Sequence, residues 1–184
     1  MPAVTDPVTT IEELLALPED GLRHELLDGV HAVTPAPSYA HQSVLSRLYS
    51  QLSRTVETHS GWQILWSPAD IVLGPRTLVQ PDLFVIRHDP ERAPASWREV
   101  GVPVLAIAVL SPSTAARDRV VKRRLYQEAG VSEYWIVDID SRVIERWRRE
   151  DDRPEVADSV LEWALDAGPS GSLDLEGLFG PAPV

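Results

Sequence analysis

The segment Leu105–Thr114, LAIAVLSPST, decides the fold. Six apolar residues run into a serine–proline–serine–threonine sequence, and a basic segment follows directly. A short apolar run that ends in this way is typical of a strand buried on both faces. The basic segment, 115–129, has a helical pattern, and a second apolar run, Glu133–Asp138, follows it. We therefore predict a strand–helix–strand unit with a right-handed parallel crossover, and functional groups where the first strand ends.

The sequence around this unit predicts an α/β fold, in which a mixed β-sheet is flanked by helices. Apolar residues recur at three- and four-residue spacing from Tyr39 to about His59, which indicates a long amphipathic helix. Asp28-Gly29 stands between two strand-like runs and indicates a hairpin over 22–34. A further strand is expected over Leu78–Ile86, with an edge or a bulge at Pro81.

Length, composition and charge bound the class of protein. At 184 residues we expect one domain, 1–184, with a genuine hydrophobic core. The absence of cysteine excludes disulfides and thiolate metal sites, and no segment has the pattern of a membrane span or a signal peptide. We therefore expect a cytoplasmic protein with no membrane partner. The formal net charge of −11 opposes non-specific attraction to nucleic acid, so a nucleic-acid enzyme would need a local basic patch.

Three side chains outside the central unit have both a chemical and a structural interpretation. Asp82, in VQPDLFVI, stands at the start of an apolar strand, where it either caps a loop or is buried and needs a cation. Glu25, in the first strand of the hairpin, is by itself an ordinary ion-pair partner. His41, on the long helix, is most often a residue with a local partner. The sequence contains no glycine-rich phosphate loop, nucleophile elbow or zinc-type histidine spacing.

The helix sequence ARDRVVKRRLY, 116–126, concentrates positive charge. It contains the only lysine of the chain, Lys122, whereas every other cationic position is arginine. A need for a compact ammonium that burial can tune would explain this lysine, and so would chance survival. Arg119, Arg123 and Arg124 make the helix the best candidate for contacting phosphates, with a solvated helix face as the alternative.

Five segments carry a resemblance to a known family. They are RHELLDG, SYAHQSVLSRL, VQPDLFVI, VLSPSTAARDRVVKRRLYQEAGVSEYWIVD and LDLEGLF. Together they resemble the Uma-two family of restriction-endonuclease-like nucleases, in the PD-(D/E)xK superfamily. The resemblance covers a core from about Ile11 to Phe179, and its most specific part is Leu110–Asp138. It implies a mixed sheet flanked by helices and a magnesium-dependent hydrolysis of phosphodiester bonds in DNA.

The resemblance assigns roles to individual residues. The glutamate of the hairpin motif falls on Glu25, and the aspartate of the QPD motif falls on Asp82, a metal ligand. The lysine falls on Lys122, which would hold the attacking water and stabilise charge on the phosphate. The backbone carbonyl of Val109 would be a further ligand of Mg²⁺ or Mn²⁺. A homodimer is expected, because cutting both strands of DNA needs two sites.

One position departs from the family pattern. The family strand has an acid two residues before the LSPS sequence, and here that position is Ala108. A methyl group cannot bind a cation, so we expect metal affinity and cleavage to be severely reduced or lost. Either a natural homologue has lost activity or a glutamate was replaced to disable catalysis. The retention of Glu25, Asp82 and Lys122 favours the second explanation, because a decaying lineage should lose several members of the site.

Three functional hypotheses follow from the sequence. The first is a metal-dependent endonuclease whose chain, as given, is disabled at Ala108. The second is a non-catalytic module that uses the nuclease-like fold to bind nucleic acid or a protein, and the negative charge favours a protein within this class. The third is an accessory protein of mobile elements with little activity of its own.

Overall fold

The computed structural model describes residues 7–92 and 94–180. The helical elements are α1 (Ile11–Leu15), α2 (Tyr39–Val56), α3 (Trp97–Val100), α4 (Ala115–Arg117), the π-helical η1 (Asp118–Lys122), α5 (Arg123–Ala129) and α6 (Leu175–Phe179). The strands are β1 (Arg23–Leu27), β2 (Val30–Thr34), β3 (Trp62–Trp66), β4 (Ile71–Gly74), β5 (Thr77–Val79), β6 (Leu83–Arg87), β7 (Leu105–Val109), β8 (Glu133–Asp138), β9 (Val143–Arg148), β10 (Glu155–Ala157), β11 (Val160–Ala164) and β12 (Ser170–Asp174). The fold class predicted from the sequence, mixed α/β, is confirmed.

A six-stranded sheet with the order β10-β9-β8-β7-β6-β3 forms the centre of the molecule. Its strands β7 and β8 are parallel, from Leu105 opposite Glu133 to Val109 opposite Val137, whereas the other pairs are antiparallel. The α4–η1–α5 segment connects β7 to β8. The predicted strand–helix–strand unit is therefore present, at the middle of a mixed sheet.

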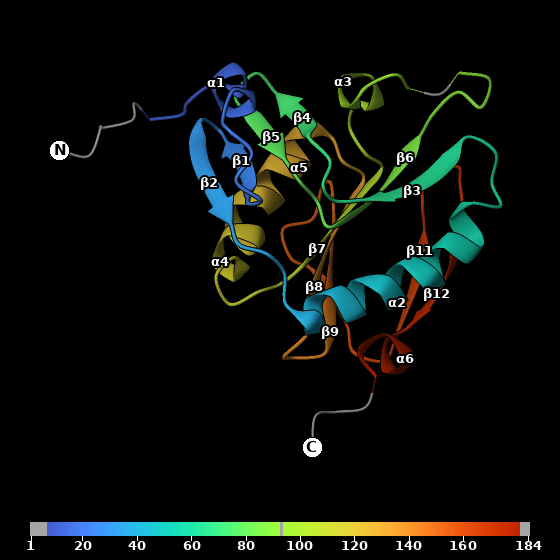
Figure 1. Cartoon of the computed structure of the whole chain (residues 1–184). Coiled ribbons are helices and arrows are strands. Elements are labelled where there is room, and N and C mark those ends of the chain that lie inside the picture. Colours follow the sequence, from blue (N-terminus) through green and yellow to red (C-terminus); the bar gives the residue numbers. More distant parts are fainter. Residues whose placement is uncertain (1–6, 93, 181–184) are drawn as a thin grey trace.

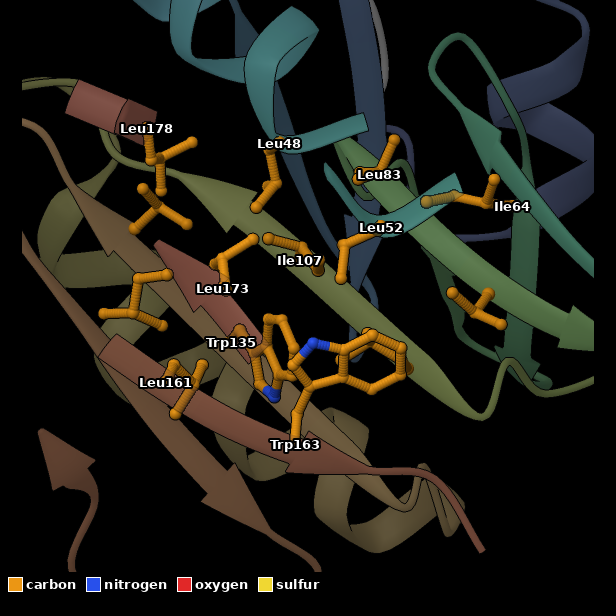
Figure 2. Packing of buried hydrophobic residues seen from close by; sticks show 14 of the residues in the cluster. Leu48, Leu52, Ile64, Leu83, Ile107, Trp135, Leu161, Trp163, Leu173 and Leu178 are labelled. Atoms are coloured by element: carbon orange, nitrogen blue, oxygen red, sulfur yellow. The ribbon is translucent and has the colours of Figure 1, made fainter. Parts of the chain in front are cut away.

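The strand β7 is buried along its whole length because both faces of the sheet are covered. Its odd-numbered residues, such as Ile107, point into a core formed with α2, α6 and the β11–β12 hairpin. In that core Trp135 and Trp163 meet edge to face, with ring centroids 6.3 Å apart. Figure 2 shows this packing, with Leu48 and Leu52 of α2 directed at the sheet.

The opposite face of the sheet packs against a second group of elements. Ala106, Ala108 and Leu110 lie there with Leu125 and Tyr126 of α5 and with buried residues of β1, β2, β4 and β5. Figure 1 shows that α5 and the small strands lie at one side of the molecule, and α2, α6 and the β11–β12 hairpin at another. The alternation of side chains along β7 thus separates two different environments.

A four-stranded sheet, β2-β1-β5-β4, lies over this second face. Its β1–β2 hairpin turns at Asp28 and Gly29, whose φ angles of 53° and 79° suit a type I′ turn. The predicted hairpin is confirmed, and α1 covers the outer face of the sheet through Ile11 and Leu14. Glu25 is consequently enclosed between this sheet and the helical segment, with an exposed fraction of 0%.

The expected single strand over Leu78–Ile86 is wrong. The chain breaks at Pro81 into β5, which belongs to the four-stranded sheet, and β6, which belongs to the six-stranded sheet. Proline has no N–H for a sheet hydrogen bond, so the ladder cannot continue through it. Asp82 follows the break, and its own N–H donates to the Ile107 carbonyl at 3.0 Å.

The long helix begins at Tyr39 as predicted and ends at Val56, three residues earlier than expected. Ser38 is its N-cap, and the Ser38 hydroxyl accepts a hydrogen bond from the His41 N–H at 3.2 Å. Among the described residues, no helix has the length and apolar composition needed to cross a bilayer.

Candidate active site

A cleft of about 450 Å³ opens where β7 ends. Asp82, Ala108 and Lys122 line it, and Glu25 lies buried beneath Lys122. These residues come from the turn before β6, from β7, from η1 and from β1. The structure therefore brings together the four positions that the family resemblance assigns to catalysis.

Asp82 is held by three donors. Its Oδ1 accepts a hydrogen bond from Arg23 Nη1 at 2.5 Å, and its Oδ2 accepts from the Val109 N–H at 2.8 Å and contacts His41 Nε2 at 3.3 Å. Burial by itself would raise the pKa of this carboxyl, but the bond from His41 and the charge of Arg23 outweigh burial and lower the pKa to about 2. Asp82 is thus an ionised, buried carboxylate. Of the two interpretations of its sequence position, the buried acid with a cationic partner is correct, and the loop cap is not.

Ala108 lies directly beside this carboxylate. The residues on either side of it, Ile107 and Val109, both form backbone hydrogen bonds with Asp82. Its side chain belongs to the face of β7 that contacts α5, and it lines the cleft. A longer side chain at position 108 would extend into the space next to Asp82 and Lys122.

Lys122 is the centre of a buried ion cluster. Its Nζ lies 2.8 Å from Glu25 Oε2 and 3.2 Å from Asp118 Oδ1, and its exposed fraction is 3%. The second oxygen of Glu25, Oε1, accepts the Gln80 N–H at 2.8 Å. Burial would lower the pKa of the ammonium, but the charges of Glu25 and Asp118 raise it above the ordinary value. Lys122 is therefore a fixed cation rather than a neutral base.

The π-helical segment η1 places both members of the 118/122 pair inside the protein. The Arg123 N–H donates to the Asp118 carbonyl, five residues earlier, so this turn is wider than an α-helical turn. Asp118 and Lys122 are both buried, whereas Val120 between them is 62% exposed. Single π-turns within helices are frequent at functional sites.

The three arginines expected to contact phosphates all have partners within the protein. Arg119 forms salt bridges with Asp138 and Glu145, each at 2.7 Å. Arg123 stacks on Trp147, with its guanidinium carbon 4.7 Å from the ring centroid, and bonds to Gln127. Arg124 pairs with Glu128 at 3.3 Å. Of the three, Arg119 alone lines the cleft.

Sequence reasoning missed two members of the cluster, Arg23 and Asp118. Arg23 precedes Glu25 by two residues, so both side chains leave β1 on the same face, and this spacing was the available signal. Asp118 precedes Lys122 by four residues on a helical segment, which is the spacing of an ion pair. His41, which the sequence singled out on the long helix, contacts Asp82, 41 residues further along the chain, so its partner is a residue of the candidate site and not a local one.

The side chains present do not by themselves fit a divalent ion. Within the described ranges, 7–92 and 94–180, no group of three or more His, Cys, Asp or Glu side chains is arranged to hold a metal. Asp82 lines the cleft together with Ala108, and both of its oxygens already bond to protein donors. Magnesium prefers several oxygen ligands, and Ala108 offers none from its side chain.

The fold and this buried cluster define a class of protein. The structure is similar to the crystal structure of "a putative nuclease belonging to DUF820" from Anabaena variabilis, with a TM-score of 0.75 and 20% sequence identity. The match covers 92% of this chain and 97% of that chain, so the two share a fold. The chain thus has the mixed α/β fold of that structure.

The sequence profile of the Uma2 family, described as "Putative restriction endonuclease", matches residues 11–175. The chain belongs to this family, and the resemblance found in its sequence is confirmed. No protein with a curated description matches the chain.

Proposed function

We propose that this chain is a catalytically disabled form of a metal-dependent DNA endonuclease. The observation that carries the proposal is the place of Ala108, which lines the cleft between two residues that bond to Asp82. The rest of the site is present: Asp82 is ionised at the edge of the cleft, and Lys122 is held as a cation by Glu25 and Asp118. Two features separate this arrangement from a metal site: position 108 lacks a carboxylate, and the Arg23 guanidinium would have to leave Asp82 Oδ1.

In the proposed parent form, a glutamate at position 108 and Asp82 would hold Mg²⁺ or Mn²⁺ together with the Val109 carbonyl. The ion would supply an activated water and neutralise charge on the phosphate. The protein's own contribution would be the fixed ammonium of Lys122, which would orient the water and stabilise negative charge. Glu25 and Asp118 would keep that ammonium in place.

The experiment that tests the proposal is restoration of the acid by Ala108→Glu. With Mg²⁺ or Mn²⁺, the variant should cleave single- or double-stranded DNA, and the unchanged chain should not. Ala108→Gln is the matched control, because it adds nearly the same volume without a charge. Asp82→Asn in the Ala108→Glu background should abolish the restored activity. Failure of a folded Ala108→Glu variant to cleave any DNA would overturn the proposal.

The alternative function is a binding module without catalysis. The hydrogen bond from Arg23 to Asp82 favours it, because a guanidinium occupies the oxygen that a metal would need. This version predicts salt-sensitive DNA binding by the unchanged chain, weakened by Arg123→Ala with Arg124→Ala. Both arginines already have partners within the protein, so they would have to exchange those partners for phosphates. Absence of binding at low salt with divalent metal present would remove this version for DNA.

We also propose that the protein acts in the cytoplasm as a homodimer. The reason is chemical: two strands of a duplex need two sites, and each chain carries one cleft of the kind described. Sedimentation of the purified chain at several concentrations tests the dimer directly.

A further inference from the structure

We propose that β2 is the surface through which two copies of this chain associate, by antiparallel pairing of β2 with the same strand of a second copy. The inference rests on the proposed homodimer and names its interface. β2 is the terminal strand of the sheet β2-β1-β5-β4, so one of its edges has no neighbouring strand. In Figure 1 it lies at a margin of the molecule, and its last residue, Thr34, accepts a hydrogen bond from Arg117 of α4.

The backbone of β2 has two residues whose hydrogen-bonding groups point away from β1. Residues along an antiparallel pair alternate between hydrogen-bonded and non-hydrogen-bonded positions. A two-residue turn closes the β1–β2 hairpin, so Leu27 and Val30, which flank the turn, form a hydrogen-bonded pair. The alternation then leaves the N–H and C=O groups of His31 and Val33 on the free edge. No other described residue bonds to these groups, so they are available to another strand.

The spacing of the free groups makes the edge complementary to itself. If two β2 strands align antiparallel about Ala32, His31 of one copy lies opposite Val33 of the other, and the reverse pair follows by symmetry. Both pairs are then hydrogen-bonded positions, whereas the two Ala32 residues meet in a non-hydrogen-bonded pair on the two-fold axis. A second copy of this chain thus satisfies the free groups of the edge, as the isologous interface of a two-fold dimer does.

The side chains of β2 do not protect its edge. Natural edge strands are blunted by short length, bulges, charged side chains or proline. At two other edges these devices are present: β10 spans only Glu155–Ala157, and the register of β4 shifts between Val72 and Gly74. β2 has five residues, none of them Lys, Arg, Asp, Glu or Pro, and Val30 and Val33 are 67% and 43% exposed. Pairing with a second copy would cover this uncharged, apolar edge.

Charge complementarity at the ends of β2 favours a second copy as the occupant. Asp28, in the hairpin turn, is exposed, and Arg117 is held beside Thr34 by its bond to the Thr34 hydroxyl. Neither Asp28 nor Arg117 forms a salt bridge with another residue that the structure describes. In the antiparallel pair Val30 of one copy lies opposite Thr34 of the other. The acid of each turn is therefore brought to the end of the partner strand where the arginine lies, which offsets part of the repulsion expected from a net charge of −11.

The pairing also fixes how the two clefts are placed. The two-fold axis of an antiparallel strand pair is perpendicular to the sheet, so the inner faces of both small sheets lie on the same side of the joined sheet. Thr34, at the end of β2, lines the cleft that contains Asp82 and Ala108. The Thr34 residues of the two copies would be about 14 Å apart, because each lies opposite Val30 of the other strand. Both clefts would face the same side, as the cutting of two strands of one duplex requires.

Crosslinking tests the register directly, because the chain has no cysteine of its own. Ala32→Cys places two thiols on the two-fold axis, with Cα atoms about 4.5 Å apart, within the range of a disulfide. Mild oxidation should convert most of this variant to a covalent dimer on a non-reducing gel. Gln63→Cys is the matched control, because Gln63 is an exposed residue of another terminal strand, β3. A crosslink through Gln63→Cys, and none through Ala32→Cys, would move the interface to β3 and overturn the proposal.

Val33→Lys tests the same edge without adding a bond. Sedimentation of the unchanged chain should show a reversible dimer with a dissociation constant on the order of 10 μM, because strand pairing buries less surface than a standard interface. Val33→Lys brings like charges together across the two strands and should raise that constant at least about tenfold. Val156→Lys, at a residue of β10 that is 57% exposed, adds the same charge and should leave it unchanged.

Two results of the sedimentation experiment would contradict the proposal. One is a folded Val33→Lys variant that dimerises as tightly as the unchanged chain, which would leave a homodimer with a different interface. The other is an unchanged chain that stays monomeric up to about twenty times the expected dissociation constant, which would remove the homodimer itself. Circular dichroism of each variant shows whether its fold is kept.

The interface and the nuclease proposal can fail separately. If Ala108→Glu cleaves DNA while Val33→Lys dimerises normally, the interface is wrong and the proposed catalytic function stands. If Ala32→Cys crosslinks but Ala108→Glu never cleaves, the interface stands and the nuclease proposal is lost.

Discussion

The two faces of β7 differ in what they bury, although they belong to the same five residues. On one face Ile107 lies among leucines and tryptophans contributed by α2, β8 and the β11–β12 hairpin (Figure 2). On the other face Ala108 lies near Asp82 and Lys122, and three buried acids are paired there with the buried Lys122 and the half-buried Arg23. All five residues of β7 are buried, but their surroundings on the two faces differ.

The two faces also differ in how much they contribute to the stability of the fold. Apolar burial stabilises the fold at little electrostatic cost, whereas removing charges from water costs several kcal/mol per ion before the pairs recover part of it. A buried ion cluster is therefore weak as a source of stability. Its presence on only one face of β7 is easier to explain by chemistry at that face than by folding.

The largest expected effect is on the apolar face. Trp135→Ala should lower the free energy of unfolding by about 4 kcal/mol, because it empties the centre of the core where Trp135 meets Trp163. Urea unfolding followed by circular dichroism measures this loss. Trp97→Ala, at a residue 38% exposed, should cost much less. Equal losses at the two tryptophans would show that the core of Figure 2 is not where the stability resides.

On the charged face, breaking the cluster and replacing it should have opposite consequences. Lys122→Met should cost about 3 kcal/mol, because it leaves Glu25 and Asp118 buried without their cation. Adding Glu25→Gln and Asp118→Asn should recover most of that loss, because no unpaired charge then remains. Urea unfolding of the single and triple variants checks both statements. A triple variant less stable than the single one would mean that the cluster does stabilise the fold.

The pH dependence of stability should report Asp82. Its pKa is about 2 in the folded protein and about 3.9 in an unfolded chain, so its contribution of about 2.6 kcal/mol is complete above pH 5 and is lost as the pH falls toward 2. About half of it should be lost by pH 3. The difference in unfolding free energy between the unchanged chain and Asp82→Asn should shrink accordingly. A difference that stays constant from pH 6 to pH 3 would rule out an ionised, stabilised Asp82.

The smallest effects should come from charges at the surface. Arg119→Ala removes two contacts with Asp138 and Glu145, but its side chain is 36% exposed, so the expected cost is about 1 kcal/mol. Arg124→Ala, in a pair exposed on both sides, should cost about 0.3 kcal/mol. Both losses should diminish at high salt, unlike the loss at Lys122. A cost at Arg124 that matched the cost at Lys122 would erase the contrast between buried and exposed pairs.

The sequence predicted the elements whose pattern is local. An unbroken apolar run specified β7, Asp28-Gly29 specified the hairpin turn, and three- and four-residue spacing specified α2. Each pattern depends on backbone preferences or on which side chains are buried, and none of the three needs knowledge of distant residues. The break at Pro81 was visible too, but not the change of sheet that accompanies it, because strand partners are chosen by the whole fold.

The candidate site was predictable only in part. Resemblance to the family placed Glu25, Asp82, Ala108 and Lys122, and the structure brings these positions to one cleft. The hydrogen bond from Arg23 and the burial of Asp118 depend on how the small sheet and the π-turn approach each other, which no spacing in the sequence states. The contact of Arg119 with Glu145, 26 residues away, was hidden for the same reason, whereas the Arg124–Glu128 pair has the four-residue spacing of a helical ion pair and could have been expected.

Binding of Mn²⁺ tests most directly whether Ala108 stands where a metal ligand is missing. Calorimetric titration of the unchanged chain, Ala108→Gln and Ala108→Glu with Mn²⁺ compares three side chains at one position without requiring a substrate. The account predicts saturable binding by Ala108→Glu alone, and its loss when Asp82→Asn is added. Binding by Ala108→Glu no tighter than by Ala108→Gln, with both variants folded, would contradict it.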